Sequence, residues 1–199
     1  MQKEHQEKTP KNNIEEIIQT IKDHIENKMF IRIERAQIDE NEKIEGFPLF
    51  QSEKLLLISK VVDFRDEGFL IMRIEDITEA YSKESDTFYE EICVKEGLQT
   101  KMTENPITDI TDFTSVIRQL FDYNKFITIQ CEYTKNELYY SIGTISSIGK
   151  DVIKFNNFDK MGIWEDTERL ISLNEITLVS IEDYYSSVFY KYVKPFSEN

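Results

Sequence analysis

Carboxylates are the side chains of this sequence that could carry out chemistry. Two acidic groups stand close together in the chain: Asp63, Asp66 and Glu67, and then Glu75, Asp76 and Glu79. Carboxylates gathered by folding can hold a hard cation or act as general acid and base. However, the spacing does not match the Asp-x-Asp-x-Asp-Gly ladder of a calcium loop. With 38 acidic residues in the chain, such groups also arise by chance, so we expect solvated turns and no catalytic activity.

The histidines, cysteines and glycines do not form a recognisable site. His5 lies in a polar N-terminal stretch, and His24 falls on the polar side of an expected helix, where we predict a solvated side chain. A zinc site needs further ligands at suitable spacing. Cys93 and Cys131 are isolated, and no glycine-rich phosphate loop is present. We therefore predict no structural metal and no cofactor.

The charge balance bears on partners and location. Lys and Arg number 24 against 38 Asp and Glu, which gives a net charge of −14. This field repels a polyanion, so nucleic-acid binding is disfavoured, and a basic protein partner fits better. Solubility alone is the other explanation of the charge. No apolar run approaches the roughly 20 residues of a membrane-spanning helix, and residues 1–8 lack the apolar core that a secretory signal requires. We therefore expect a cytoplasmic protein without membrane attachment.

The apolar spacing predicts a helix followed by strands, twice. Ile14, Ile17, Ile18, Ile21 and Ile25 form one helical stripe, and Phe113, Val116, Ile117, Leu120 and Phe121 form another. Short segments rich in β-branched and aromatic residues follow each stripe, at 30–36, 43–50, 54–63, 68–74 and 76–81, and at 125–133, 137–147, 151–157, 162–173 and 175–181. Residues 86–94 and 182–193 are spaced as further short helices.

An internal repeat links these two sets. Phe30-Ile-Arg-Ile-Glu corresponds to Phe126-Ile-Thr-Ile-Gln, the Gly46 segment to the Gly143 segment, and Asp76-Ile-Thr to Glu175-Ile-Thr. The order of the matches is the same in both halves, which indicates a duplication. The predicted fold class is therefore α+β, with two tandem units, each a helix followed by a five-stranded antiparallel, barrel-like sheet. The expected divisions are a disordered tail at 1–11, a first unit at 12–96, a linker at 97–106 and a second unit at 107–199.

A helix followed by five short strands resembles the Sm-like small barrel, a relative of SH3-type barrels. The resemblance rests on the helix at 17–25, the strand from Phe30, Gly46, the central strand at 55–62 and Asp76-Ile-Thr. Asp63-Phe-Arg-Asp does not reproduce the Asp-x-x-Met-Asn-like signature of the RNA-binding members, so no RNA-binding residue carries over. The acidic, aromatic-rich chain without catalytic motifs is also similar in type to bacterial immunity proteins.

These features predict a non-catalytic protein-binding module, immunity-like or regulatory, whose acidic surface engages a basic protein; the alternative is an Sm-like RNA-associated factor. The expected docking site is a single acidic rim with an exposed phenylalanine as anchor: Asp63, Phe64, Asp66, Glu67, Phe69, Glu75, Asp76 and Glu79. The aromatic C-terminal helix is expected to pack over the second unit through Tyr184, Tyr185 and Tyr192, with an interface as the other interpretation. A dimer is compatible with this sequence.

Overall fold

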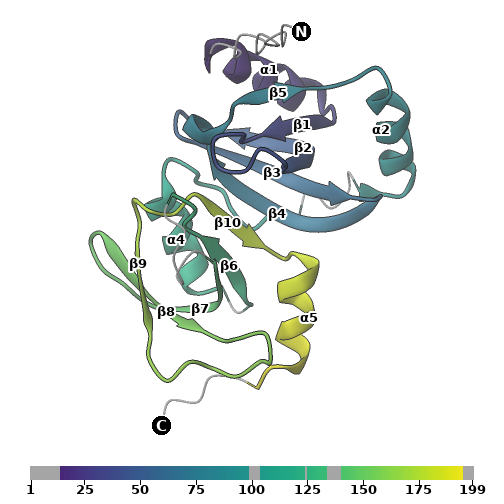
Figure 1. Ribbon diagram of the computed structural model, residues 1–199. Coiled ribbons are helices and arrows are strands. Elements are labelled where there is room, and N and C mark those ends of the chain that lie inside the picture. Colours follow the sequence, from purple (N-terminus) through teal and green to yellow (C-terminus); the bar gives the residue numbers. More distant parts are fainter. Residues whose placement is uncertain (1–13, 99–103, 124, 134–139, 195–199) are drawn as a thin grey trace, which may run out of the picture.

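The computed structural model describes residues 14–98, 104–123, 125–133 and 140–194 (Figure 1). Within these ranges the chain forms α-helices, one short 3-10 helix and β-strands, and the predicted α+β class is confirmed. The helices are α1 (Ile14–Asn27), η1 (Ile74–Asp76), α2 (Asp86–Lys95), α4 (Phe113–Phe121) and α5 (Tyr184–Tyr192). The strands are β1 (Ile31–Glu34), β2 (Lys43–Gln51), β3 (Leu55–Val62), β4 (Arg65–Arg73), β5 (Glu79–Tyr81), β6 (Ile127–Gln130), β7 (Tyr140–Ile148), β8 (Val152–Asn157), β9 (Arg169–Ser172) and β10 (Leu178–Ile181).

All ten strands belong to one antiparallel sheet, in the order β5-β1-β2-β3-β4-β10-β6-β7-β8-β9. Among the described strands, β5 pairs only with β1 and β9 only with β8, so the sheet is not closed. The prediction of two barrel-like sheets was therefore wrong. Instead of closing on β5, strand β4 hydrogen-bonds to β10 from the other half of the chain. Edge strands favour any neighbour that satisfies their free backbone groups.

Strand β10 joins the two halves. It pairs with β4 through Ile181↔Phe69 and with β6 through Ile181↔Ile127. Its side chains fill cores on both sides: Val179 packs with the α4 cluster, and Leu178 with the α1 cluster. The residues predicted to form two units thus share one sheet and interlocking cores.

Arg73 at the end of β4 fastens this junction further. Its Nε donates to the carbonyl oxygen of Ile176 at 2.7 Å, and its Nη2 donates to that of Asn174 at 2.9 Å. The guanidinium also lies 5.2 Å from the ring centroid of Phe113 on α4. One side chain of the first half therefore contacts the loop and the helix of the second half.

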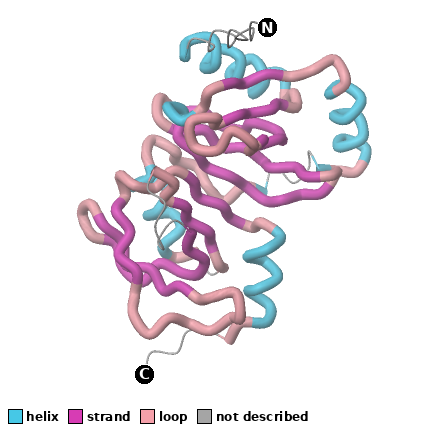
Figure 2. The backbone as a smooth tube through the Cα atoms, viewed as in Figure 1, coloured by secondary structure: helices cyan, strands magenta, loops and turns pink. Residues whose placement is uncertain are grey.

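The helices lie around the sheet, and α2 and α5 are on the same side of the molecule (Figures 1 and 2). Helix α1 buries Ile17 and Ile21, as its stripe predicted, and α4 buries Phe113, Val116, Ile117 and Leu120. The carboxylate of Asp112 caps α4 by accepting from Ser115 N at 2.9 Å.

The prediction that the His24 side chain is solvated was wrong. It is buried, and its Nδ1 lies 2.7 Å from the carbonyl oxygen of Thr20. The predicted tail lies outside the described residues.

Matching details recur in the two halves. Ile31 pairs with Gly46 and Ile127 with Gly143, and each glycine strand has a register shift a few residues later. Thr78 Oγ1 donates to Glu34 O at 3.0 Å, and Thr177 Oγ1 donates to Gln130 O at 3.1 Å. Both threonines therefore tie the start of the last strand of each half to the end of the first.

Candidate functional site

The tip of the β3–β4 hairpin is an acidic turn with an aromatic side chain. Val62 pairs with Arg65, which leaves Asp63 and Phe64 as a two-residue turn. Both have positive φ, 49° and 58°. Such turns match the twist of a hairpin but usually contain Asn and Gly, because a Cβ is disfavoured there. A bulky phenylalanine in this conformation needs other contacts to hold it.

Tyr89 of α2 provides those contacts. Its ring stacks on Phe64 with 4.2 Å between centroids and 25° between planes, and its hydroxyl accepts a hydrogen bond from Phe64 N at 3.1 Å. Behind it, Tyr89 lies 5.0 Å from Phe30, which is buried against Phe47. Burial raises the pKa of Tyr89, so its hydroxyl stays neutral. The turn is thus fixed to the core by a chain of aromatic rings, while Phe64 itself remains 39% exposed.

Helix α2 is held firmly beside the tip. The Asp86 carboxylate accepts from Nε and Nη2 of Arg32 at 2.9 and 2.8 Å, and this pairing lowers the pKa of Asp86. The Glu90 carboxylate accepts from Phe30 N at 2.8 Å, and Cys93 is buried beneath the helix. On the outer side, Phe88 and Val94 are exposed. We call Val62–Glu67 together with the exposed side chains of α2 the tip surface.

Acidic groups outnumber basic ones on the tip surface. The turn carries three carboxylates and one arginine at 63–67. On α2, the exposed charged side chains are Glu91 and Lys95, which pair with each other. Asp63 is almost fully exposed, and Asp66 accepts from Gly68 N at 3.2 Å. The resulting arrangement is an aromatic centre with an acidic rim, which is suited to binding a basic macromolecule.

The structure separates the predicted docking site into two parts. Asp63, Phe64, Asp66 and Glu67 lie at the tip, whereas Glu75, Asp76 and Glu79 lie beyond the other end of β4. Because a strand advances about 3.3 Å per residue, the two groups are roughly 25 Å apart. Phe69, expected as an exposed anchor, is only 3% exposed and packs in the core. The single acidic rim predicted from the sequence therefore does not form.

Asp76 belongs to a buried polar cluster between the two halves. Its carboxylate accepts a hydrogen bond from the Tyr133 hydroxyl at 3.0 Å. Burial raises the pKa of Asp76, although the Tyr133 hydrogen bond and the positive charge of Arg35 oppose that rise. Glu75 remains exposed and pairs with Arg73 at 3.3 Å. Asp76 is thus engaged inside the protein and is not part of an accessible acidic surface.

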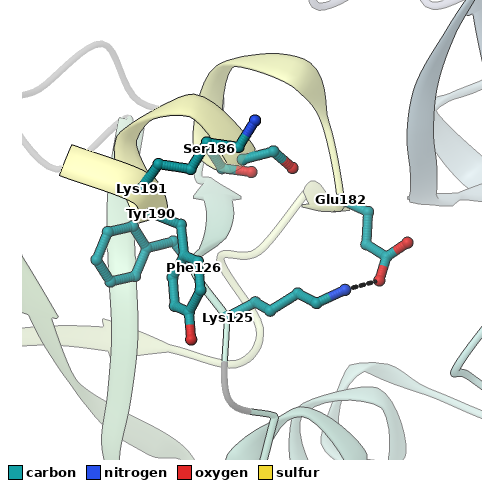
Figure 3. A pocket seen from close by; sticks show the side chains of 7 residues that line it. Lys125, Phe126, Glu182, Ser186, Tyr190 and Lys191 are labelled. Atoms are coloured by element: carbon teal, nitrogen blue, oxygen red, sulfur yellow. Dashed lines mark hydrogen bonds and ion pairs between the residues drawn. The ribbon is translucent and has the colours of Figure 1, made fainter. Parts of the chain in front are cut away.

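A small surface pocket lies where β6 begins beside α5 (Figure 3). It has a volume of about 190 Å³ and is lined by Lys125, Phe126, Glu182, Ser186, Ser187, Tyr190 and Lys191. Its walls are mainly apolar. The Lys125 ammonium is bonded to the Glu182 carboxylate, which also accepts from the Tyr123 hydroxyl at 2.7 Å. The pocket could receive a small apolar group.

Helix α5 packs through a different face than expected. Phe189 and Val193 contact the cluster of Phe126, Phe158 and Trp164, whereas Tyr184, Tyr185 and Tyr192 are exposed. The helix therefore does cover the second half, but its tyrosines face solvent. Its start lies against β4, since a Cβ on Gly68 would be 2.6 Å from the backbone nitrogen of Asp183, the N-cap residue of the helix. The tyrosines thus project from a helix adjacent to the hairpin that carries the tip surface (Figure 1).

Sequence reasoning missed the platform beneath Phe64. The signal was present in the aromatic pair Phe88-Tyr89, whose spacing was assigned only to a helix. Within the described residues, no group of three or more His, Cys, Asp and Glu side chains could hold a metal. Among the helices described, none combines the length and apolarity needed to cross a bilayer. Comparisons with family models, curated proteins and solved structures gave no significant match to this chain.

Proposed function

We propose that this chain is a non-catalytic protein-binding module whose tip surface engages a basic protein. The observation that carries the proposal is the stacked pair Phe64 and Tyr89, an exposed aromatic ring on a fixed turn surrounded by carboxylates. Aromatic anchors at the centre of an interface supply much of its binding energy, and rim charges select the partner and speed its approach.

The rigidity of the tip supports this role. Association is weakened when side chains and loops must be ordered on binding. Here the Tyr89 hydroxyl and ring already hold Phe64 in a left-handed conformation. A partner would therefore bind a turn that is already ordered, and the entropic cost of binding would be small. Backbone strain of this kind costs about 1–3 kcal/mol and is concentrated at functional positions. A solvated turn without a partner would not need a phenylalanine there.

We also infer that the two halves are diverged copies of one small α+β unit of the Sm-like kind. The equal strand orders, the paired positions of Gly46 and Gly143 and the matched hydrogen bonds of Thr78 and Thr177 support this. The Phe64–Tyr89 pair lies only in the first copy, and the second carries the exposed α5 tyrosines at the corresponding place. The binding surface is therefore assigned to the first copy.

The test begins with identification of a partner. Immobilised wild-type chain and a Phe64→Gly variant are exposed to a lysate of the source cells, and proteins retained only by the wild type are identified and purified. Association with that purified partner is then measured for Asp63→Lys/Glu67→Lys. We expect association to slow severalfold at low salt, with a smaller difference at high salt, because added ions screen exposed charges.

The matched control is Glu53→Lys/Glu175→Lys, which changes the net charge equally at exposed positions near Arg73, at the end of β4 that is remote from the tip. If the control slows association as much as the tip variant, only net charge matters and the tip surface is not the binding site. The RNA-associated alternative is tested by filter binding of single-stranded RNA against salt concentration. A high affinity with a steep salt slope would favour that alternative over the protein-binding proposal.

A further inference from the structure

The pocket beside α5 can be compared with the same place in the first half. Its seven lining residues each follow a residue of the first half by 96 positions, which is the separation of Phe30 and Phe126 in the internal repeat. The structure supports this correspondence, since Cys93 lies in the buried cluster of Phe30, and Phe189, 96 positions later, packs against the cluster of Phe126. In chain order, the seven counterparts are Met29, Phe30, Asp86, Glu90, Glu91, Val94 and Lys95.

A glutamate occupies this place in the first half. The Glu90 carboxylate accepts a hydrogen bond from Phe30 N at 2.8 Å. Its counterpart Ser186 has a much shorter side chain, which bonds to the carboxylate of the N-cap residue Asp183 at 2.6 Å. Among the described residues, no side chain accepts a hydrogen bond from Phe126 N. The pocket therefore opens where the first half holds a carboxylate, and the backbone donor of that place lacks a side-chain acceptor.

A buried hydroxyl on the same face of the sheet also lacks a partner. Thr128 takes the place of Arg32, whose guanidinium holds the Asp86 carboxylate of α2. Thr128 is 2% exposed, and its Oγ1 has no hydrogen-bond partner among the described residues. It lies on the same face as Phe126, because side chains two residues apart in a strand share a face. Buried polar groups are nearly always hydrogen-bonded, so an unsatisfied one here indicates a missing water, ion or ligand.

The charge of this place is reversed between the halves. In the first half its residues include three carboxylates and one lysine, and in the second they include one carboxylate and two lysines. Lys95 pairs with Glu91 at 3.9 Å, whereas Lys191 has Ser187 at the matching position. Within the part of the chain that the structure describes, Lys191 forms no ion pair. At physiological salt, charges more than about 8 Å away are largely screened, so this rim favours an anion although the chain as a whole is acidic.

The pocket is large enough for a small apolar group. Phe126 and Tyr190 meet edge to face there, with 5.2 Å between ring centroids. The volume of about 190 Å³ exceeds the roughly 150 Å³ of an engineered protein cavity that binds benzene. A single aromatic ring or a short aliphatic chain therefore fits against these walls (Figure 3).

We propose that this pocket binds a small carboxylic acid with a short apolar body, whose carboxylate takes the place of the Glu90 carboxylate. In this arrangement, the ligand accepts a hydrogen bond from Phe126 N and pairs with the Lys191 ammonium at the rim. Its apolar body contacts the rings of Phe126 and Tyr190. The site belongs to the second half and the tip surface to the first, so the two proposals succeed or fail independently.

The test uses the full chain with phenylacetate as the probe and phenylacetamide as its neutral isostere. Trp164 is the only tryptophan of the chain, and its ring centroid lies 5.6 Å from that of Phe126, so its fluorescence reports on the pocket. Phenylacetate should change this fluorescence saturably. Phenylacetamide should bind severalfold more weakly, because hydrogen bonds to a charged acceptor are the stronger ones. Ligand-observed NMR checks both affinities independently of the tryptophan.

Two variants test the assigned contacts. Ser186→Glu restores the residue type of the first half, fills the pocket with its own carboxylate and should abolish phenylacetate binding. Lys191→Gln removes only the rim cation at an exposed position, and should weaken phenylacetate severalfold while leaving phenylacetamide unchanged. Lys22→Gln, at an exposed position of α1 in the other half, is the matched control and should bind both probes like wild type (Figure 1).

Four results would each overturn the proposal. They are the absence of a saturable response to phenylacetate, equal affinities for phenylacetate and phenylacetamide, undiminished phenylacetate binding by folded Ser186→Glu, and equal phenylacetate affinities of Lys191→Gln and Lys22→Gln. Circular dichroism verifies that each variant is folded, and Lys191→Gln, as a surface substitution, keeps the proposal testable where Ser186→Glu does not fold.

Discussion

Arg35 and Glu132 form an ion pair across the two halves of the sheet, with 2.6 Å between Nη1 and Oε2. The Arg35 side chain is fully buried, and it also bonds the Glu42 carboxylate of its own half at 2.5 Å. Burial opposes the charged form of Arg35, but its hydrogen bonds to Glu132 and the charge of Glu42 outweigh that effect and raise its pKa. The Glu132 carboxylate also lies 2.5 Å from Thr177 Oγ1, next to the start of β10.

Removing one member of this pair should strongly destabilise the protein. Arg35→Ala leaves the buried Glu132 carboxylate without its partner, and such a loss costs about 3–5 kcal/mol. Urea unfolding of wild type and variant measures the difference. Arg65→Ala is the control, because Arg65 is exposed and its pair with Asp63 contributes at most about 1 kcal/mol. Equal losses in the two variants would show that the buried pair has no special role.

The pairing itself is tested with a double variant. Replacing both partners, by Arg35→Met and Glu132→Leu, removes the buried charges together, and similar replacements elsewhere are close to neutral. We expect the double variant to lose less stability than the sum of the two single variants. Additive losses would contradict a direct coupling between these two side chains.

The raised pKa of the buried Asp76 carboxyl group predicts that the stability of the protein depends on pH. Burial raises its pKa above the ordinary value of 3.8, so the folded state binds the Asp76 proton more tightly than the unfolded state does. Between the ordinary and the raised pKa the folded state carries more protons, and the free energy of unfolding therefore falls as pH rises through that window. Above the window, the full cost of an ionised buried carboxylate remains.

Asp76→Asn isolates this effect. The amide oxygen can still accept the Tyr133 hydrogen bond, but the side chain no longer titrates. Relative to wild type, the variant should gain stability as pH rises from 3.8 toward neutrality. Urea unfolding of both proteins at several pH values measures the difference, in which the contributions of unchanged carboxylates cancel. A constant difference over this range, or one of opposite sign, would contradict the raised pKa.

The sequence was sufficient to locate most helices and strands along the chain, but not to predict which strands pair across the two halves. Alternation and β-branched residues located all five strands of each half, because these signals depend on neighbours in the chain. The apolar runs at 69–72 and 178–181 fit burial on both faces yet do not specify a neighbour. For that reason the β4–β10 pairing, which opens the expected barrels into one sheet, could not be predicted from periodicity.

The candidate site shows the same limit. Asp63 and Glu75 are close in sequence, but the nine-residue strand β4 lies between them and places them beyond its opposite ends. Phe64 and Phe69 are both near the turn, and only the pairing of β4 decides that Phe64 is exposed and Phe69 buried. On α5, periodicity grouped the tyrosines correctly, but the position of Phe158 and Trp164 determines that Phe189 packs inward. These outcomes depend on tertiary contacts, which local patterns do not encode.

Two glycines in matching places give the last prediction. Gly46 and Gly143 have φ of 158° and 150°, and each passes close to the neighbouring strand. A Cβ would lie 2.0 Å from the carbonyl oxygen of Ser59 at the first position and 2.0 Å from that of Asn156 at the second. Because the obstructing atoms belong to the backbone, no side-chain rotation relieves the overlap. Gly46→Ala and Gly143→Ala should each lower the free energy of unfolding by about 3 kcal/mol or more.

Gly97→Ala is the matched control for these two variants. Gly97 also has a positive φ, 78°, but a Cβ there would meet no atom within 4 Å. Its substitution should therefore cost only the left-handed conformation, about 1–2 kcal/mol. Thermal or urea unfolding of the three variants separates the steric cost from the conformational one. If Gly46→Ala and Gly143→Ala lose no more stability than Gly97→Ala, the close approach of the paired strands does not explain the glycines.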